Sequence, residues 1–175
     1  MNAWALVLTG SSSAGKTGLA RALQNRCAQP AWLFVADECF PAGPPIRTSG
    51  TEAAGESPIV LFHRGIAAWM TAGNNVIVDG SLPYDDHRLR ARCLDELRGA
   101  GEVHLVGVTA TVDELRVRER QRSDARPPGW AVRQHRDVND GLELACSVDT
   151  TDRPPTSCAE DVLAQLSART GQQWV

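Results

Sequence analysis

The sequence lacks the features of disulfide-rich, metal-binding and membrane-spanning proteins. Its five cysteines are odd in number and include no C-x-x-C pair, so we expect neither a disulfide framework nor a zinc or redox motif. No stretch approaches the roughly 18 apolar residues that a membrane span needs, and no basic and then apolar segment opens the chain as in a secretion signal. We therefore expect free thiols, no membrane partner and a cytoplasmic protein.

An excess of positive charge is also absent. The chain has 18 Lys and Arg against 21 Asp and Glu, for a formal net charge of -3. Proteins that hold a nucleic-acid backbone do so largely through Lys and Arg, so no nucleic-acid partner is expected. The chain has no internal repeat and no long linker, and 175 residues suit one domain. We predict a single domain over residues 1–175.

Short apolar runs alternate with helical patterns along the chain. The runs that predict strands are residues 4–8, 32–37, 76–80, 103–108 and 143–150. The patterns that predict helices are residues 19–27, 58–73, 84–97, 113–122 and a last stretch opened by a capping-box pattern at 157–160. Strands that alternate with helices indicate an α/β fold with a five-stranded parallel sheet flanked by helices. Residues 41–57 and 122–130 interrupt the pattern, and we interpret them as loops over a site.

The clearest motif is GSSSAGKT, which matches the P-loop pattern G-x-x-x-x-G-K-[ST] at every fixed position. Its members are Gly10, Ser11, Ser12, Ser13, Ala14, Gly15, Lys16 and Thr17. The glycines let successive backbone N–H groups turn inward around a phosphate, with Lys16 reaching the β and γ phosphates and Thr17 binding Mg²⁺. A strand precedes the motif and a helix follows it, as phosphate binding requires. The motif predicts ATP and Mg²⁺ as cofactors, and the guanine-reading N-K-x-D is absent.

Two aspartates follow predicted strands. Asp37 closes the run WLFVAD, and Asp79 closes VIVD. Because the carboxyl ends of parallel strands meet at one edge of a sheet, both should face the P-loop. Asp37 is a candidate catalytic base that orients a hydroxyl group and accepts its proton late in the transfer, although a capping role is the alternative. Asp79 either holds Mg²⁺, grips the substrate, or forms a plain turn with Gly80.

The run RVRERQRSDAR supplies a cluster of arginines. Three of them recur at i, i+4 and should line one helical face: Arg118, Arg122 and Arg126. Guanidinium groups on that face can close over a triphosphate as a mobile lid. The alternative is a solvated helix face, and the presence of the P-loop favours the lid. Arg116 and Arg120 fall on another face, where Glu119 is available for i, i+3 pairing.

Taken together, these blocks resemble the chloramphenicol phosphotransferase-like group of small P-loop kinases. The resemblance covers nearly the whole chain, and its remaining blocks are FHRGIAAW before NVIVDG, RERQRSDARPPG with a following Gln134, and VDTT. It implies O-phosphorylation of a small hydroxylated molecule by ATP, with Asp37 as the base and Lys16 and Thr17 at the phosphates. The three arginines fall where the family has its lid, and VDTT, which ends at Thr151, would lie beside the adenine.

The acceptor is left open by the sequence. Asn139 and Leu144-Ala145 stand where the family often has a histidine and a Tyr-Asp pair. One hypothesis is that the protein is a resistance enzyme that phosphorylates an antibiotic. The alternatives are a metabolic sugar, nucleoside or nucleotide kinase, and a non-catalytic switch that only binds ATP. The oligomeric state is open between a monomer and a homodimer.

Overall fold

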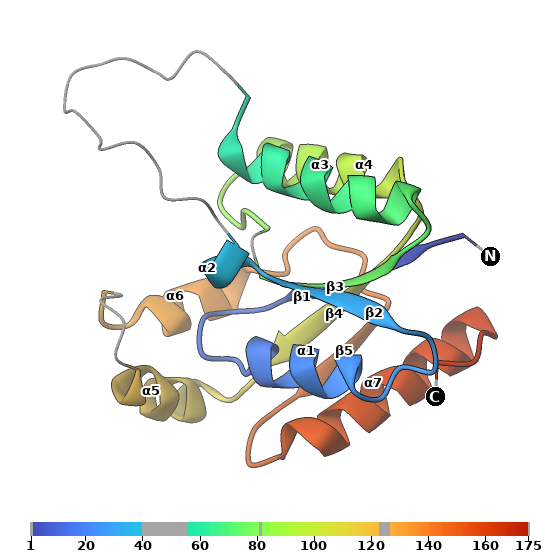
Figure 1. Ribbon diagram of the computed structural model, residues 1–175. Helices are drawn as coiled ribbons and strands as arrows, with labels where there is room; N and C mark the ends of the chain where they lie inside the picture. Colours follow the sequence, from blue (N-terminus) through green and yellow to red (C-terminus); the bar gives the residue numbers. More distant parts are fainter. Residues whose placement is uncertain (1, 40–55, 81, 123–126, 175) are drawn as a thin grey trace.

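The structure of the protein is a computed structural model that describes residues 2–39, 56–80, 82–122 and 127–174 (Figure 1). Most of the predicted loop over residues 41–57 lies outside these ranges, and so does Arg126.

A five-stranded parallel sheet forms the centre of the fold. Its strands are β1 (Trp4–Thr9), β2 (Ala31–Val35), β3 (Asn75–Asp79), β4 (Glu102–Thr109) and β5 (Cys146–Asp149). Their order in the sheet is β2-β3-β1-β4-β5, and every pair is parallel, which confirms the predicted fold class. The chain passes from β1 to one side of the sheet and later returns to the other side. Parallel sheets bind their ligands at such a reversal, beyond the carboxyl ends of the strands.

Helices cover both faces of this sheet (Figure 1). The helices α1 (Lys16–Gln24) and α7 (Pro155–Thr170) pack on one face, and α3 (Pro58–Thr71) and α4 (His87–Arg98) pack on the other. Successive residues of β1 point to opposite faces, so Leu6 and Leu8 join the first core and Ala5 and Val7 the second. A strand buried on both faces reads as the continuous apolar run seen in the sequence.

Three further helices lie toward the carboxyl edge of the sheet: α2 (Ala36–Cys39), α5 (Val112–Gln121) and α6 (Trp130–Asp137) (Figure 1). No helix in the described ranges combines the length and the apolar character needed to cross a membrane.

Several element boundaries differ from the prediction. The capping box at residues 157–160 is wrong, because α7 begins at Pro155, whose fixed φ suits the first turn of a helix. Helix α4 begins at His87, where the side chain of Asp86 accepts the Leu89 N–H at 2.9 Å. Strand β2 ends at Val35, so Asp37 lies on the short helix α2 just beyond it.

Candidate active site

The P-loop runs from the end of β1 to the start of α1. At Gly10 φ is 155°, and a Cβ there would lie 2.1 Å from the carbonyl oxygen of Val108 on β4. Only glycine fits this close approach. Gly15, with φ of 89°, forms the N-cap of α1, and Ser13 also has a positive φ of 63°. The loop therefore has the strand-loop-helix geometry that phosphate binding requires.

Polar groups of this loop lack partners in the described structure. The hydroxyl oxygens of Ser11 and Ser13 are buried and make no hydrogen bond. Buried polar groups are normally hydrogen-bonded, so such orphans call for an explanation. Lys16 Nζ donates to the carbonyl oxygens of Gly10 and Ser11, each at 2.8 Å, and so lies across the mouth of the loop. A loop with unmet donors and an ammonium group at its mouth fits an anionic ligand such as a phosphate chain.

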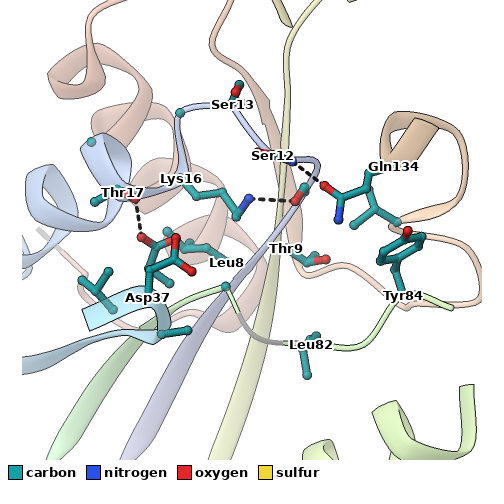
Figure 2. A pocket seen from close by; sticks show the side chains of 18 of the residues that line it. Leu8, Thr9, Ser12, Ser13, Lys16, Thr17, Asp37, Leu82, Tyr84 and Gln134 are labelled. Atoms are coloured by element: carbon teal, nitrogen blue, oxygen red, sulfur yellow. Dashed lines mark hydrogen bonds between the residues drawn. The ribbon is translucent and has the colours of Figure 1, made fainter. Parts of the chain in front are cut away.

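A cavity of about 370 Å³ opens in front of the loop (Figure 2), within the usual size of small-molecule sites. Six of the eight motif residues line it, whereas Ser11 and Ala14 do not. The lining also includes Asp37, Asp79, Arg118, Arg122 and Gln134. Residues from both halves of the sequence thus meet in one cavity.

Thr17 and Asp79 lie in direct contact. The Thr17 hydroxyl donates to Asp79 Oδ2 at 2.6 Å, and Asp79 is only 5% exposed. Hydroxyl and carboxylate oxygens are ligands that Mg²⁺ accepts, usually together with water and phosphate oxygens. Within residues 2–39, 56–80, 82–122 and 127–174, no group of three or more His, Cys, Asp or Glu side chains could hold a metal. Thr17 and Asp79 are the two residues here that could supply oxygen ligands to a Mg²⁺ ion bound to a nucleotide.

Asp37 lines the same cavity from α2, the short helix that follows strand β2. In the register of β2 with β3, Val35 is paired with Asp79. The chain then turns into α2, which carries Asp37 to the open side of the cavity, below Lys16 and Thr17 in Figure 2. Asp37 is exposed, in contrast to the buried Asp79. The two carboxylates thus have different surroundings, one beside the Thr17 hydroxyl and one facing the space that an incoming molecule would fill.

Arg118 joins α5 to the P-loop. Its guanidinium donates to Thr150 Oγ1 at 2.9 Å and to the Thr150 carbonyl oxygen at 2.8 Å. Thr150 Oγ1 in turn lies 2.8 Å from the carbonyl oxygen of Ala14, to which it donates. Thr151, which the resemblance placed beside the adenine, is not among the lining residues, and its hydroxyl accepts the Thr111 N–H at 2.8 Å. The sequence pointed to the segment VDTT but missed Thr150 as the residue that contacts the loop.

Arg118 and Arg122 do not share one helical face, in contrast to the prediction. Helix α5 ends at Gln121, and Arg122 takes an extended conformation with ψ of 145°. Arg122 still lines the cavity together with Arg118, while Arg126 lies outside the described residues. Arg116 pairs with Asp113 at 3.0 Å on the exposed side of α5, in agreement with the solvated face predicted for it.

Glu119 does not make the i, i+3 pair predicted for it. Its carboxylate accepts the N–H groups of Gly129 at 2.8 Å and Ala131 at 2.9 Å, at the start of α6. The hydrogen bond from the Ala131 N–H is the largest cause that holds the pKa of Glu119 below its usual value, and the bond from the Gly129 N–H adds to it. Burial acts in the opposite direction but does not outweigh these bonds. Glu119 therefore joins α5 to α6 across the segment between them.

Helix α6, which the sequence did not predict, is also tied to the loop. The side-chain oxygen of Gln134 accepts the Ser12 N–H at 2.8 Å, and Asn139 Oδ1 accepts the Thr9 hydroxyl at 3.0 Å. Figure 2 shows Gln134 reaching Ser12 from the side of the cavity that lies across from Thr17. Asn139 thus has a structural role where the family often carries a histidine.

Removing the Glu119 carboxylate should loosen α6. We expect Glu119→Ala to lower the free energy of unfolding by about 1–2 kcal/mol, the scale of a partly solvated hydrogen bond to a charged group. Because the pKa is lowered in the folded protein, the stabilisation is present above the unfolded pKa and is lost as the pH falls through the folded pKa. Urea unfolding at pH 7 and under acid should show the difference from wild type shrinking in acid. The control is Glu143→Ala, which removes an exposed carboxylate and should change little; equal losses in both variants would contradict the prediction.

Comparison with known proteins gives three findings on sequence. The family model described as chloramphenicol phosphotransferase-like protein matches residues 3–167. A Mycobacterium tuberculosis protein of strain H37Rv, whose name gives O-phosphotransferase as a proposed activity, is 31% identical over 185 aligned positions. That match covers 90% of this chain and 79% of the relative. Its counterpart in strain CDC 1551 matches equally well.

Solved structures with the same fold are kinases and a resistance protein. The tunicamycin resistance protein of Deinococcus radiodurans has a TM-score of 0.67 at 20% identity, covering 94% of this chain and 95% of that one. A gluconokinase of Sinorhizobium meliloti has a TM-score of 0.64 at 16% identity, with 95% and 93% covered. The Mycobacterium tuberculosis APS kinase, in complex with AMPPNP and APS, has a TM-score of 0.64 at 13% identity, with 95% and 98% covered. At these identities the likeness concerns the fold alone.

Proposed function

The chain belongs to the chloramphenicol phosphotransferase-like family and is a kinase-type phosphotransferase, and we propose that it transfers the γ-phosphate of ATP to a hydroxyl group of a small molecule. One observation carries the proposal. A P-loop with its Thr17–Asp79 pair and an exposed carboxylate, Asp37, line the same cavity. A donor half and an acceptor half of a phosphoryl-transfer site thus lie together.

The donor half would be organised by the P-loop. Lys16 would exchange the carbonyl oxygens of Gly10 and Ser11 for the β and γ phosphates, and the loop N–H groups would bind the same chain. Thr17 and Asp79 would hold Mg²⁺, which when bound neutralises charge on the phosphates. The orphan hydroxyl of Ser13 lies on the cavity wall and would gain an acceptor.

The acceptor half would depend on Asp37. In the transfer, a bond forms between the acceptor oxygen and the γ-phosphorus, and the bond from that phosphorus to the bridging oxygen of ADP breaks. The proton of the acceptor hydroxyl passes to Asp37 and from there to solvent. An aspartate is too weak a base to remove this proton beforehand, but it can orient the hydroxyl and take the proton as the new bond forms.

Arginines that line the cavity would stabilise the transferring group. Arg118 and Arg122 line the cavity beside the P-loop, and Arg126 belongs to the same proposed lid by sequence. Cationic guanidinium groups neutralise charge that spreads over the phosphoryl oxygens in the transition state. Glu114 at 2.7 Å and Thr150 hold the Arg118 guanidinium beside the P-loop.

Hydroxylated antibiotics are the first acceptors to test. The family takes its name from chloramphenicol, and the Deinococcus radiodurans protein of the same fold is a tunicamycin resistance protein. A metabolic kinase for sugars or nucleosides would use the same donor half, so sugars, nucleosides and nucleotides belong in the same screen.

The test is an ATP-consumption screen over these acceptors, followed by mass spectrometry of every hit. We expect at least one acceptor to gain 80 Da, the mass of one phosphoryl group in place of a proton, only with active protein. The matched control is Lys16→Ala. Tight ATP binding without a phosphorylated product from any acceptor would contradict the proposal and favour a non-catalytic nucleotide switch.

A further inference from the structure

We propose that Gln134 is a catalytic residue that donates a hydrogen bond from its side-chain amide to the phosphoryl group during transfer. The proposal rests on the function proposed above and adds a donor to it. The Gln134 side chain makes one hydrogen bond with the P-loop. Its oxygen accepts the Ser12 N–H at 2.8 Å.

That bond fixes which way the amide points. A backbone N–H can only donate, so the atom that faces Ser12 must be the oxygen of Gln134 and not its nitrogen. The NH₂ group therefore lies on the other side of the planar amide. In Figure 2 this nitrogen points away from Ser12 and down toward the cavity. In the described part of the chain, Nε2 makes no hydrogen bond, although it is a strong donor.

The position of this donor complements that of Lys16. Gln134 lines the cavity together with Ser12, Ser13 and Lys16. Figure 2 shows Lys16 and Thr17 on one side of the opening and Gln134 on the other. A phosphoryl group seated over the loop would thus have Lys16 on one flank and the Gln134 amide on the opposite flank. The terminal phosphate carries several oxygens, and a donor on each flank matches the spread of charge over them in the transition state.

The amide is held in place before any ligand binds. Glu119 fixes the start of α6 through Gly129 and Ala131. Beyond the helix, Asn139 is bonded to Thr9 at the end of β1. The ring of Trp130 on α6 also packs edge-on against Tyr84, with centroids 6.3 Å apart. A donor whose helix is anchored at both ends costs little reorganisation when the transition state forms, the condition under which such donors are effective.

Gln134 takes part without exchanging protons. The bond formed and the bond broken are those of the transfer described above, and the proton still passes from the acceptor to Asp37. Gln134 only lowers the energy of the charged phosphoryl oxygens. Glutamate at this position would keep an oxygen for the Ser12 N–H but would place a second, negative oxygen where the NH₂ group was. This substitution separates a structural role from a catalytic one.

The test compares binding of Mg·ADP with binding of Mg·ADP plus aluminium fluoride, which occupies the place of the transferring phosphoryl group and needs no known acceptor. Isothermal titration calorimetry would be run on wild type, Gln134→Ala, Gln134→Glu and the control Arg136→Ala, which changes an exposed residue of the same helix. We expect Gln134→Ala to weaken the fluoride complex by about 10- to 100-fold, as for one hydrogen bond to a charged group, with Mg·ADP affinity within about twofold of wild type. Gln134→Glu should lose at least as much, and Arg136→Ala should match wild type.

Three outcomes would overturn the proposal. The first is that Gln134→Glu binds Mg·ADP with aluminium fluoride as tightly as wild type. The second is that Gln134→Ala loses affinity equally for Mg·ADP and for the fluoride complex. The third is that Gln134→Ala binds the fluoride complex as tightly as wild type. Failure of the proposed function would be observed differently: the wild-type protein would phosphorylate no acceptor in the screen. A wild type that phosphorylates an acceptor while Gln134→Ala keeps its kcat would remove Gln134 from the mechanism and leave the kinase in place.

Discussion

Replacing Lys16 with alanine should lower phosphoryl transfer by about 10³-fold or more, because a cation on the transferring group is worth about 10³ to 10⁵ in rate. In the structure its ammonium lies 2.8 Å from the carbonyl oxygens of Gly10 and Ser11, at the mouth of the loop. With ATP bound, the ammonium would turn from these neutral acceptors to the phosphates. The loss should appear as a fall in kcat and as weaker binding of ATP, measured by steady-state kinetics and calorimetry.

A chemical experiment can test the same residue without a substitution. Lys16 is the only lysine in the 175-residue sequence, whose other 17 basic residues are arginines. An amine-acylating reagent therefore has two targets, Lys16 and the terminal amino group, and intact-mass measurement with peptide mapping separates them. We expect Mg·ATP to protect Lys16 and to leave the terminal amino group reactive.

One control removes a cation just beyond the helix that begins at Lys16, and the other keeps the positive charge at position 16. Arg26→Ala removes a half-buried cation that pairs with Glu160 at 3.3 Å just beyond the end of α1, and its transfer rate should equal that of wild type. Lys16→Arg keeps the charge but replaces a compact ammonium with a broader planar group, so it should restore little activity. Normal transfer by Lys16→Ala, or acylation of Lys16 that ATP does not slow, would exclude Lys16 from the donor site.

The fold and the strand-loop-helix geometry of the P-loop were predictable because their signals are local. The continuous apolar run of β1 indicates a strand buried on both faces, and the glycines of GSSSAGKT indicate the positive φ angles found at Gly10 and Gly15. Gly10 shows why, since any side chain there would meet the Val108 carbonyl on β4. The strand-end rule also brought Asp37 and Asp79 to one cavity. It did not indicate that Asp79 would be buried against Thr17 while Asp37 stays exposed, a difference that the side chains around them decide.

The missed parts depend on contacts between distant residues. Helix α6 has eight residues, too few to be stable alone, and it is held by Glu119 from α5 and by bonds to the P-loop. The sequence of α6 itself does not indicate these contacts. Thr150 and Thr151 differ by one position, and only the path of the chain beyond β5 decides that Thr150 meets Arg118 and Ala14. The spacing of four residues predicted one helical face for Arg118 and Arg122. That prediction is wrong because α5 ends at Gln121, so Arg122 no longer has a helical conformation.

Replacing Asp37 with asparagine should separate binding from chemistry. A positioned general base contributes about 10² to 10⁴ in rate, so kcat for the true acceptor should fall by that factor. Asp37 is not part of the P-loop, and asparagine has nearly the same size, so the affinity for Mg·ATP should stay within about twofold of wild type, inside the scatter expected for an exposed substitution. Asparagine can still donate and accept hydrogen bonds, but it cannot take the proton of the acceptor hydroxyl.

The adjacent carboxylate supplies a matched control. Glu38 follows Asp37 on α2, is exposed, and pairs with Arg21 at 3.1 Å away from the cavity. It is not among the residues that line the cavity. Glu38→Gln makes the same chemical change one position along and should leave both kcat and ATP affinity unchanged. Near-normal transfer by Asp37→Asn would show that the proton leaves by another route, and an equal fall in both variants would attribute the effect to α2 as a whole. A fall confined to Asp37→Asn assigns the proton to the carboxylate of Asp37.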